Sequence, residues 1–229
     1  MTRALHSALL LLVVLAPLPL GSNREWSWTL CALLAGVIGL AWGINALARP
    51  ATVSRSLPVG MMLLFLAACT WVVVQASPLV PAAWTHPLWS MTSEGTGLDA
   101  VATITLSRDD SLTALVRLLS YGLVFFLSFQ LARNSDRARA AFGWLAVAGV
   151  IYAVFGLAAF WGGFETHLWF SQDGANRSVR GPFVNRNSFA TFLGLCLLCA
   201  LALFYQRLAL RRNPLYSAPV GRQQRIEEF

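Results

Sequence analysis

The stretch SFATFLGLCLLCALALFYQ, residues 188–206, contains no charged side chain. A transmembrane α-helix needs about 20 mainly apolar residues in succession, so this stretch is long enough to cross a bilayer. The residues directly before it, RSVRGPFVNRN (177–187), concentrate arginine and asparagine. A predicted membrane helix therefore starts at a cluster of cations and amides.

The composition of the whole chain agrees with a membrane environment. Of 229 residues, 57% are hydrophobic and 12% are charged, whereas a soluble domain is about 25% charged. The formal charge is +7, and every basic residue is an arginine in or beside a short segment between apolar runs, Arg117 apart. This placement favours a role in membrane topology over a nucleic-acid partner. We therefore expect an all-α, polytopic membrane protein.

Six apolar segments make up a single predicted transmembrane domain, residues 1–206. They cover about residues 5–21, 28–48, 57–76, 113–132, 141–161 and 188–206. The first resembles a signal peptide because Arg3 precedes a short apolar run. Since LAPLPLGSN (15–23) has no small-x-small cleavage pattern, we expect a retained helix that bends near Pro17 and Pro19.

The arginines between the predicted spans indicate the orientation, because cytoplasmic segments are enriched in positive charge. With both termini inside, the inner segments hold Arg3, Arg49, Arg55, Arg133, Arg137, Arg139, Arg207, Arg211, Arg212, Arg222 and Arg225. The outer segments hold Arg24, Arg108, Arg177 and Arg180. We therefore expect both termini in the cytoplasm, with residues 207–229 as a basic tail that is apparently truncated.

A first outer loop is predicted from about Ser77 to Leu112. Its start, SPLVPAAWTHPLW (77–89), combines prolines, which oppose a continuous helix, with tryptophans, which favour the membrane–water interface. At its end, Ser107 and Asp110 have the spacing of a capping box. A catalytic carboxylate pair is the alternative interpretation of Asp109 and Asp110, and we favour the cap.

Cysteine and histidine give little support for metal or redox chemistry. Cys196 and Cys199 have a C-x-x-C spacing, but they lie in the middle of an apolar span, where packing is the simpler interpretation. The histidines His6, His86 and His167 are far apart in the sequence. We expect no metal site and no cofactor.

The residues before the last span are suited to binding an anion. Asn185, Asn187 and Ser188 are good helix N-caps, and the Gly181–Pro182 pair predicts a turn before them. A helix N-terminus attracts anions, and arginine forms forked hydrogen bonds with phosphate oxygens. The cluster therefore predicts a phosphate site at the outer membrane surface, reinforced by Arg177, Arg180 and Arg186. Binding of ordinary anionic lipid is the simpler alternative.

Arg117 is predicted about two turns inside the fourth span, counting from the outer side. An arginine near the bilayer centre costs roughly 2.5–3.5 kcal/mol on insertion scales. Its long side chain can extend to the outer headgroups, or it can face the helix bundle and the same anion as Arg180. The sequence leaves both interpretations open.

RSVRGPFVNRNSFATFLGL (177–195) resembles the R-x-x-G-x-F-x-N-x-N-x-x-A signature of the O-antigen ligase and polymerase superfamily. The match runs from Gly181 to Ala190, with Arg180 directly before the glycine. LAPLPLGSNREWSW, HPLW and SLTALVRLLSYGLVFF are similar to stretches in exopolysaccharide-associated members. The resemblance covers most of the chain.

This resemblance implies a bacterial inner-membrane protein of cell-surface polysaccharide biosynthesis. Such proteins transfer glycan from a polyprenyl diphosphate carrier to a sugar acceptor at the periplasmic face, without metal or nucleotide. The family's first diphosphate-binding arginine corresponds to Arg180. Its glycine and asparagines correspond to Gly181, Asn185 and Asn187, and Arg117 matches a commonly basic position.

The chain departs from the family in one large respect. Members carry a second half with a periplasmic loop that supplies a further arginine and a histidine, and nothing in this sequence matches it. His167 lies in a different loop. We therefore expect an N-terminal half that is incomplete alone, with unknown catalytic residues and with a separately encoded C-terminal half as one interpretation. Alternatives are a lipid-anion binding or transport module and a remnant without activity. Glycan, acceptor, and ligase or polymerase activity stay open.

Overall fold

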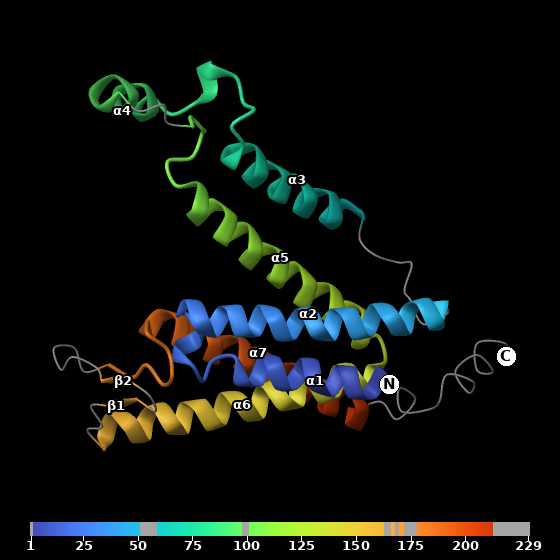
Figure 1. Ribbon diagram of the computed structural model, residues 1–229. Helices are drawn as coiled ribbons and strands as arrows, with labels where there is room; N and C mark the ends of the chain where they lie inside the picture. Colours follow the sequence, from blue (N-terminus) through green and yellow to red (C-terminus); the bar gives the residue numbers. More distant parts are fainter. Residues whose placement is uncertain are drawn as a thin grey trace. The chain divides into compact units, whose positions relative to one another are not determined.

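The computed structural model describes residues 2–50, 59–97, 101–162, 166–167, 170–171 and 178–212. This part of the chain is helical (Figure 1). Its α-helices are α1 (Thr2–Leu15), α2 (Glu25–Ala48), α3 (Val59–Ala76), α4 (Leu88–Thr96), α5 (Arg108–Leu131), α6 (Ser135–Trp161) and α7 (Arg186–Arg212). Two short 3₁₀ helices, η1 (Leu20–Ser22) and η3 (Ala82–Trp84), and one antiparallel pairing of β1 (Thr166–His167) with β2 (Phe170–Ser171) complete it.

Five of these helices are long and apolar enough to cross a membrane: α2, α3, α5, α6 and α7 up to Ala209. The shortest, α3, has 18 residues and is therefore about 27 Å long, close to the thickness of the hydrocarbon core. The expected all-α architecture of a polytopic membrane protein is confirmed at this level. The first of the six predicted spans contains a shorter apolar helix, Thr2–Leu15.

The first predicted span is shorter than expected. α1 has 14 residues and ends at Leu15, so it is about 21 Å long. The chain then turns instead of bending through the two prolines, because Pro17 and Pro19 have no N–H to continue the helix. The Gly21 N–H donates to the Pro17 carbonyl at 2.8 Å, which closes the turn.

α5 starts earlier than the sequence pattern predicts, at Arg108 instead of Thr113. The Ser107 Oγ accepts a hydrogen bond from the Asp110 N–H at 3.3 Å, so the predicted cap is present. The reciprocal half of the capping box differs, since the Ser107 N–H donates to the Thr105 Oγ1 at 3.3 Å. Because the cap, and not the first apolar residue, sets the helix start, Asp109 and Asp110 lie in the first turn, where their charges stabilise the helix.

The chain divides into two compact units, residues 1–5 with 32–130 and residues 6–31 with 131–229. In the first unit, α5 contacts α3 and α2 at glycines. A Cβ added to Gly122 of α5 would lie 2.3 Å from the Phe65 ring of α3, and one added to Gly39 of α2 would lie 3.1 Å from Leu123. Small residues of this kind let membrane helices approach each other.

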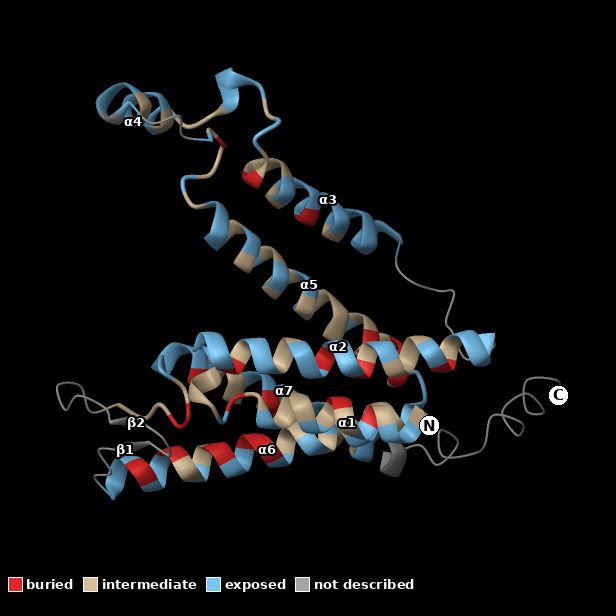
Figure 2. Ribbon diagram, in the orientation of Figure 1, coloured by how far each residue is buried: buried red, intermediate tan, exposed pale blue. Residues whose placement is uncertain are grey.

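In the second unit, α6 packs against α7 and binds the end of α1. The buried residues of α6 recur along one face, at Ala148, Gly149, Tyr152, Gly156 and Ala159 (Figure 2). At Gly149 an added Cβ would lie 2.4 Å from the Cys196 Cβ. The Tyr152 hydroxyl donates to the Val14 carbonyl at 2.8 Å and ties α1 to α6.

Candidate functional site

The anion-binding cluster predicted from the sequence lies at the start of α7. Asn185 is the N-cap, because its Oδ1 accepts from the Asn187 N–H at 2.8 Å and its carbonyl accepts from the Phe189 N–H at 3.1 Å. The prediction that an asparagine caps this helix is confirmed for Asn185. Asn187 lies inside the first turn, and Asn185, Arg186 and Asn187 are all exposed. The helix start therefore presents amides and a cation at the surface.

The loop before the cap, residues 178–185, is called the motif loop here. Gly181 has φ +53°, the left-handed region that glycine adopts at little cost. A Cβ on Gly181 would lie 2.6 Å from the Phe189 ring, and a Cβ on Gly156 would lie 3.0 Å from the same ring. Both glycines contact the buried ring of Phe189, so α6 and α7 hold the motif loop in one position.

An aromatic cluster extends this anchor to the N-terminal turn. The Phe183 ring lies 5.7 Å from Phe189 and 5.5 Å from Phe192, centre to centre. Tyr152 meets Phe192 edge to face at 5.5 Å. Gly21 approaches Phe183 so closely that an added Cβ would lie 2.6 Å from the ring. The motif loop therefore packs between α6, α7 and the turn that follows α1.

That N-terminal turn has unusual backbone geometry. Leu20 and Ser22 have positive φ of 55° each, on either side of Gly21 at 64°. Non-glycine residues in this region are strained and persist where surrounding contacts hold them. The Ser22 Oγ donates to the Ala16 carbonyl at 2.6 Å, which holds one side of the turn. Phe183 of the motif loop packs against Gly21 of the same turn.

Arg180 occupies the centre of the motif loop. Its side chain is half-buried, and its Nε donates to the Ser178 Oγ at 2.8 Å. This hydrogen bond restricts the guanidinium of Arg180. Fixing an arginine side chain otherwise costs about 2 kcal/mol of rotamer entropy. The structure thus brings together, in one unit, the five predicted site residues Arg180, Gly181, Asn185, Arg186 and Asn187.

Two further predicted site residues are not placed at this cluster. Arg177 lies outside the described residues. Arg117 belongs to α5 in the other unit, half-buried and about 14 Å along the helix from Arg108. Since α5 begins five residues before the predicted span, Arg117 is deeper along its helix than the sequence pattern indicated. Its part in the site stays a prediction.

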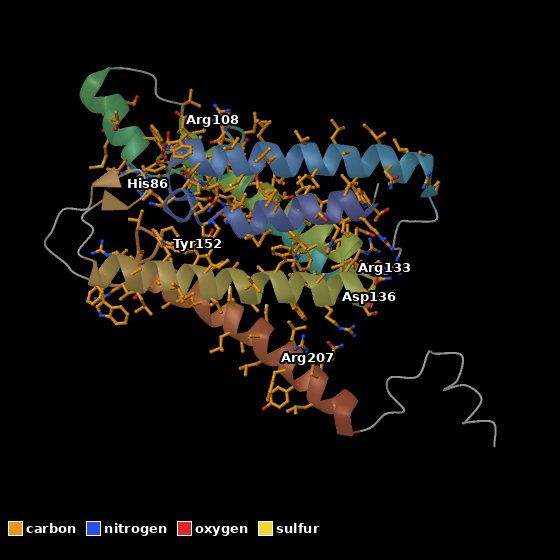
Figure 3. The ribbon with its side chains drawn as sticks, turned by 90° about the horizontal axis from the view of Figure 1, so that it is seen from below. His86, Arg108, Arg133, Asp136, Tyr152 and Arg207 are labelled. Atoms are coloured by element: carbon orange, nitrogen blue, oxygen red, sulfur yellow. The ribbon has the colours of Figure 1, made fainter. Side chains whose placement is uncertain are left out.

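The structure shows the surroundings of the cysteines and of the possible metal ligands that the sequence analysis considered. Each of the four cysteines is free, and Cys196 packs against Gly149 as an apolar side chain. No three of the His, Cys, Asp and Glu residues within the described ranges lie close enough together to hold a metal ion. In Figure 3, His86, Arg108, Arg133, Asp136, Tyr152 and Arg207 are labelled, and none of these belongs to the motif loop.

The aromatic anchor was missed by sequence reasoning. Phe183 and Phe189 belong to the quoted motif, but their partners Gly21 and Gly156 are distant in the sequence. The signal that was present is a set of small residues, Ala148, Gly149, Gly156 and Ala159, that share one face of the α6 segment with Tyr152. Such a stripe indicates a close helix contact without naming the partner.

Comparisons of this chain with protein-family models, with curated proteins and with solved structures find no match. The helices themselves define the class. The described part of the chain has five helices long and apolar enough to span a membrane, which is the pattern of a multi-pass helical membrane protein.

Proposed function

We propose that this protein binds the diphosphate of a polyprenyl-linked glycan at the start of α7. By resemblance it acts as the O-antigen ligases and polymerases do, in a bacterial inner membrane with six spans and both termini inside. The observation that carries the proposal is the half-buried Arg180, held by Ser178 and fixed in one unit with the N-terminus of a membrane helix.

The electrostatics of this arrangement suit an anion. A helix N-terminus carries a partial positive charge equivalent to about half a proton, and α7 has no acidic residue in its first turn. α5 is the contrasting case, since Asp109 and Asp110 neutralise its N-terminus. The start of α7 adds Arg180 and Arg186 to the same partial charge. A doubly charged phosphate group is therefore favoured there over a neutral headgroup.

The packing of the motif loop supports recognition of a specific group. A loop that is fixed before binding loses little conformational entropy when the ligand arrives. Phe183 and Phe189 anchor the motif loop on both sides of its turn. The carrier's apolar chain, in this proposal, lies against the lipid-facing surface while its diphosphate reaches Arg180 from the membrane surface.

The proposed chemistry is charge stabilisation of the leaving diphosphate. Glycosyl transfer also needs a base that accepts the proton of the acceptor hydroxyl. No residue near the motif loop is assigned this role here, and we propose that a partner segment supplies it. A lipid-anion binding or transport module is the second candidate, favoured by the half-buried Arg117 on a membrane helix.

Ligand selectivity tests the proposal. The full chain in lipid nanodiscs is expected to bind polyprenyl diphosphate about tenfold more tightly than polyprenyl monophosphate, because the second phosphate adds a charge-assisted hydrogen bond. Phosphatidylglycerol supplied at equal mole fraction serves as the competitor that represents ordinary anionic lipid. Equal competition by phosphatidylglycerol would show a general anion site and would contradict the proposal.

A further inference from the structure

A second feature of the chain, independent of the proposed function, lies between α3 and α5. Residues 77–107, called the pinned loop here, are described except for 98–100. The Thr105 N–H donates to the Gln75 carbonyl at 3.1 Å, and the His86 N–H donates to the Thr103 carbonyl at 3.0 Å. Thr103 is 2% exposed. The loop is therefore closed by backbone hydrogen bonds at the ends of two membrane-crossing helices.

Much of the pinned loop is exposed (Figure 2), and several of its exposed side chains are large and apolar. The exposed large apolar side chains of the loop are Leu79 (92%), Met91 (65%), Val101 (61%), Trp84 (56%), Leu106 (50%) and Leu88 (46%). Monomeric soluble surfaces rarely gather apolar side chains in this way. Glu94 is the one charged residue among the described residues of the loop. The described residues of the loop therefore combine these exposed apolar side chains with a single charge.

The helix α4 divides this surface into two faces. Leu88 and Met91 are three residues apart, so they lie on one face of the helix. At 3.6 residues per turn, Ser90 lies on the side of the helix opposite Leu88, and it is exposed as well. A short helix with an apolar face and a polar face is the form taken by segments that lie in the plane of a membrane interface.

The two helices that flank the pinned loop, α3 and α5, indicate that lipid covers this surface. α3 ends at Ala76 and α5 begins at Arg108, and both are long and apolar enough to cross a membrane. The hydrogen bond from Thr105 to Gln75 keeps the loop at these two helix ends, and hence within reach of the bilayer surface. Exposed apolar side chains are also present near the end of α3, at Trp71 and Val73, and shortly after it at Leu79.

We propose that the pinned loop is a membrane-surface anchor. α4 lies in the interface, with Leu88 and Met91 at the boundary of the acyl chains and Ser90 toward water. The indole of Trp84 lies at the headgroup level, where amphipathic rings are favoured. The anchor fixes the ends of α3 and α5 at one depth in the bilayer.

Cysteine labelling in lipid vesicles tests this surface. The variants Leu88→Cys and Ser90→Cys are compared in the full chain with a water-soluble maleimide, and the unsubstituted chain gives the background from its own cysteines. We expect Leu88→Cys to react about tenfold more slowly than Ser90→Cys, because a thiol at the acyl boundary meets the reagent only when the helix leaves the membrane. Met91→Cys is expected to match Leu88→Cys.

Two outcomes would overturn the proposal. Equal and fast labelling of both faces would place α4 in water. Slow labelling at Met91→Cys that disappears when the lipid-to-protein ratio is raised would show that a second protein copy, and not lipid, covers the apolar face. Slow labelling that is independent of dilution supports the anchor.

Discussion

Replacing Gly181 with alanine is expected to destabilise the motif loop and to weaken diphosphate binding. The added Cβ would lie 2.6 Å from the Phe189 ring, and Gly156 contacts the same ring, which leaves the ring little room to move. The left-handed backbone costs an alanine about 1–2 kcal/mol, and overpacking costs about 1–3 kcal/mol more. The free energy of unfolding, from denaturation of the protein in mixed micelles, measures the sum.

Two other glycines separate the contributions at Gly181. Gly97 also has positive φ, at 66°, but no atom lies within 4 Å of an added Cβ, so Gly97→Ala measures the backbone cost alone. Gly194 is helical and equally open, so Gly194→Ala is expected to be neutral or slightly stabilising. If Gly181→Ala were as stable as Gly97→Ala, the contact with Phe189 would not be part of the anchor.

Replacing Gly149 with alanine is expected to force α6 and α7 apart. The new Cβ would lie 2.4 Å from the Cys196 Cβ and 3.1 Å from its Sγ. A Cβ atom moves with its backbone, so a rotamer change cannot relieve this clash. We expect a loss of about 1–3 kcal/mol in the free energy of unfolding, measured in the same micelles. Gly143→Ala on the same helix meets no atom within 4 Å and is the matched control.

A second substitution tests whether the clash with Cys196 is the cause. In the Gly149→Ala background, Cys196→Gly removes the opposing Cβ and is expected to restore part of the stability. Cys196→Ala keeps that Cβ and is expected to restore none. Equal stability of the two double variants, or of Gly149→Ala and Gly143→Ala, would show that this glycine does not set the distance between the helices.

The sequence was most informative where composition alone decides the structure. An apolar run such as residues 188–206 must be helical in a bilayer, since a helix satisfies its own backbone hydrogen bonds there. The cap at Asn185 was also predictable, because the interaction is local and needs only the right side chain before the helix. Helix ends were predicted less well, as Leu15 and Arg108 show, because turns and caps set them, and not hydropathy.

The contacts that fix the candidate site depend on residues distant in the sequence. Nothing in the local pattern around Phe189 indicates that Gly156 and Gly181 both contact its ring, or that Gly21 packs on Phe183. Such pairs follow from the arrangement of α6, α7 and the N-terminal turn, which no periodicity encodes. The sequence could therefore predict which residues form the site, but not what holds them.

The central claim is that Arg180 binds the diphosphate, and one measurement tests it most directly. The Kd for polyprenyl diphosphate is measured in nanodiscs for the unsubstituted chain, for Arg180→Gln and for Arg108→Gln, an exposed arginine at the start of a different membrane helix. Loss of hydrogen bonds between charged groups costs about 1.5–3 kcal/mol, so Arg180→Gln is expected to weaken binding roughly tenfold to a hundredfold, with Arg108→Gln unchanged. Equal affinities for all three proteins would contradict the account.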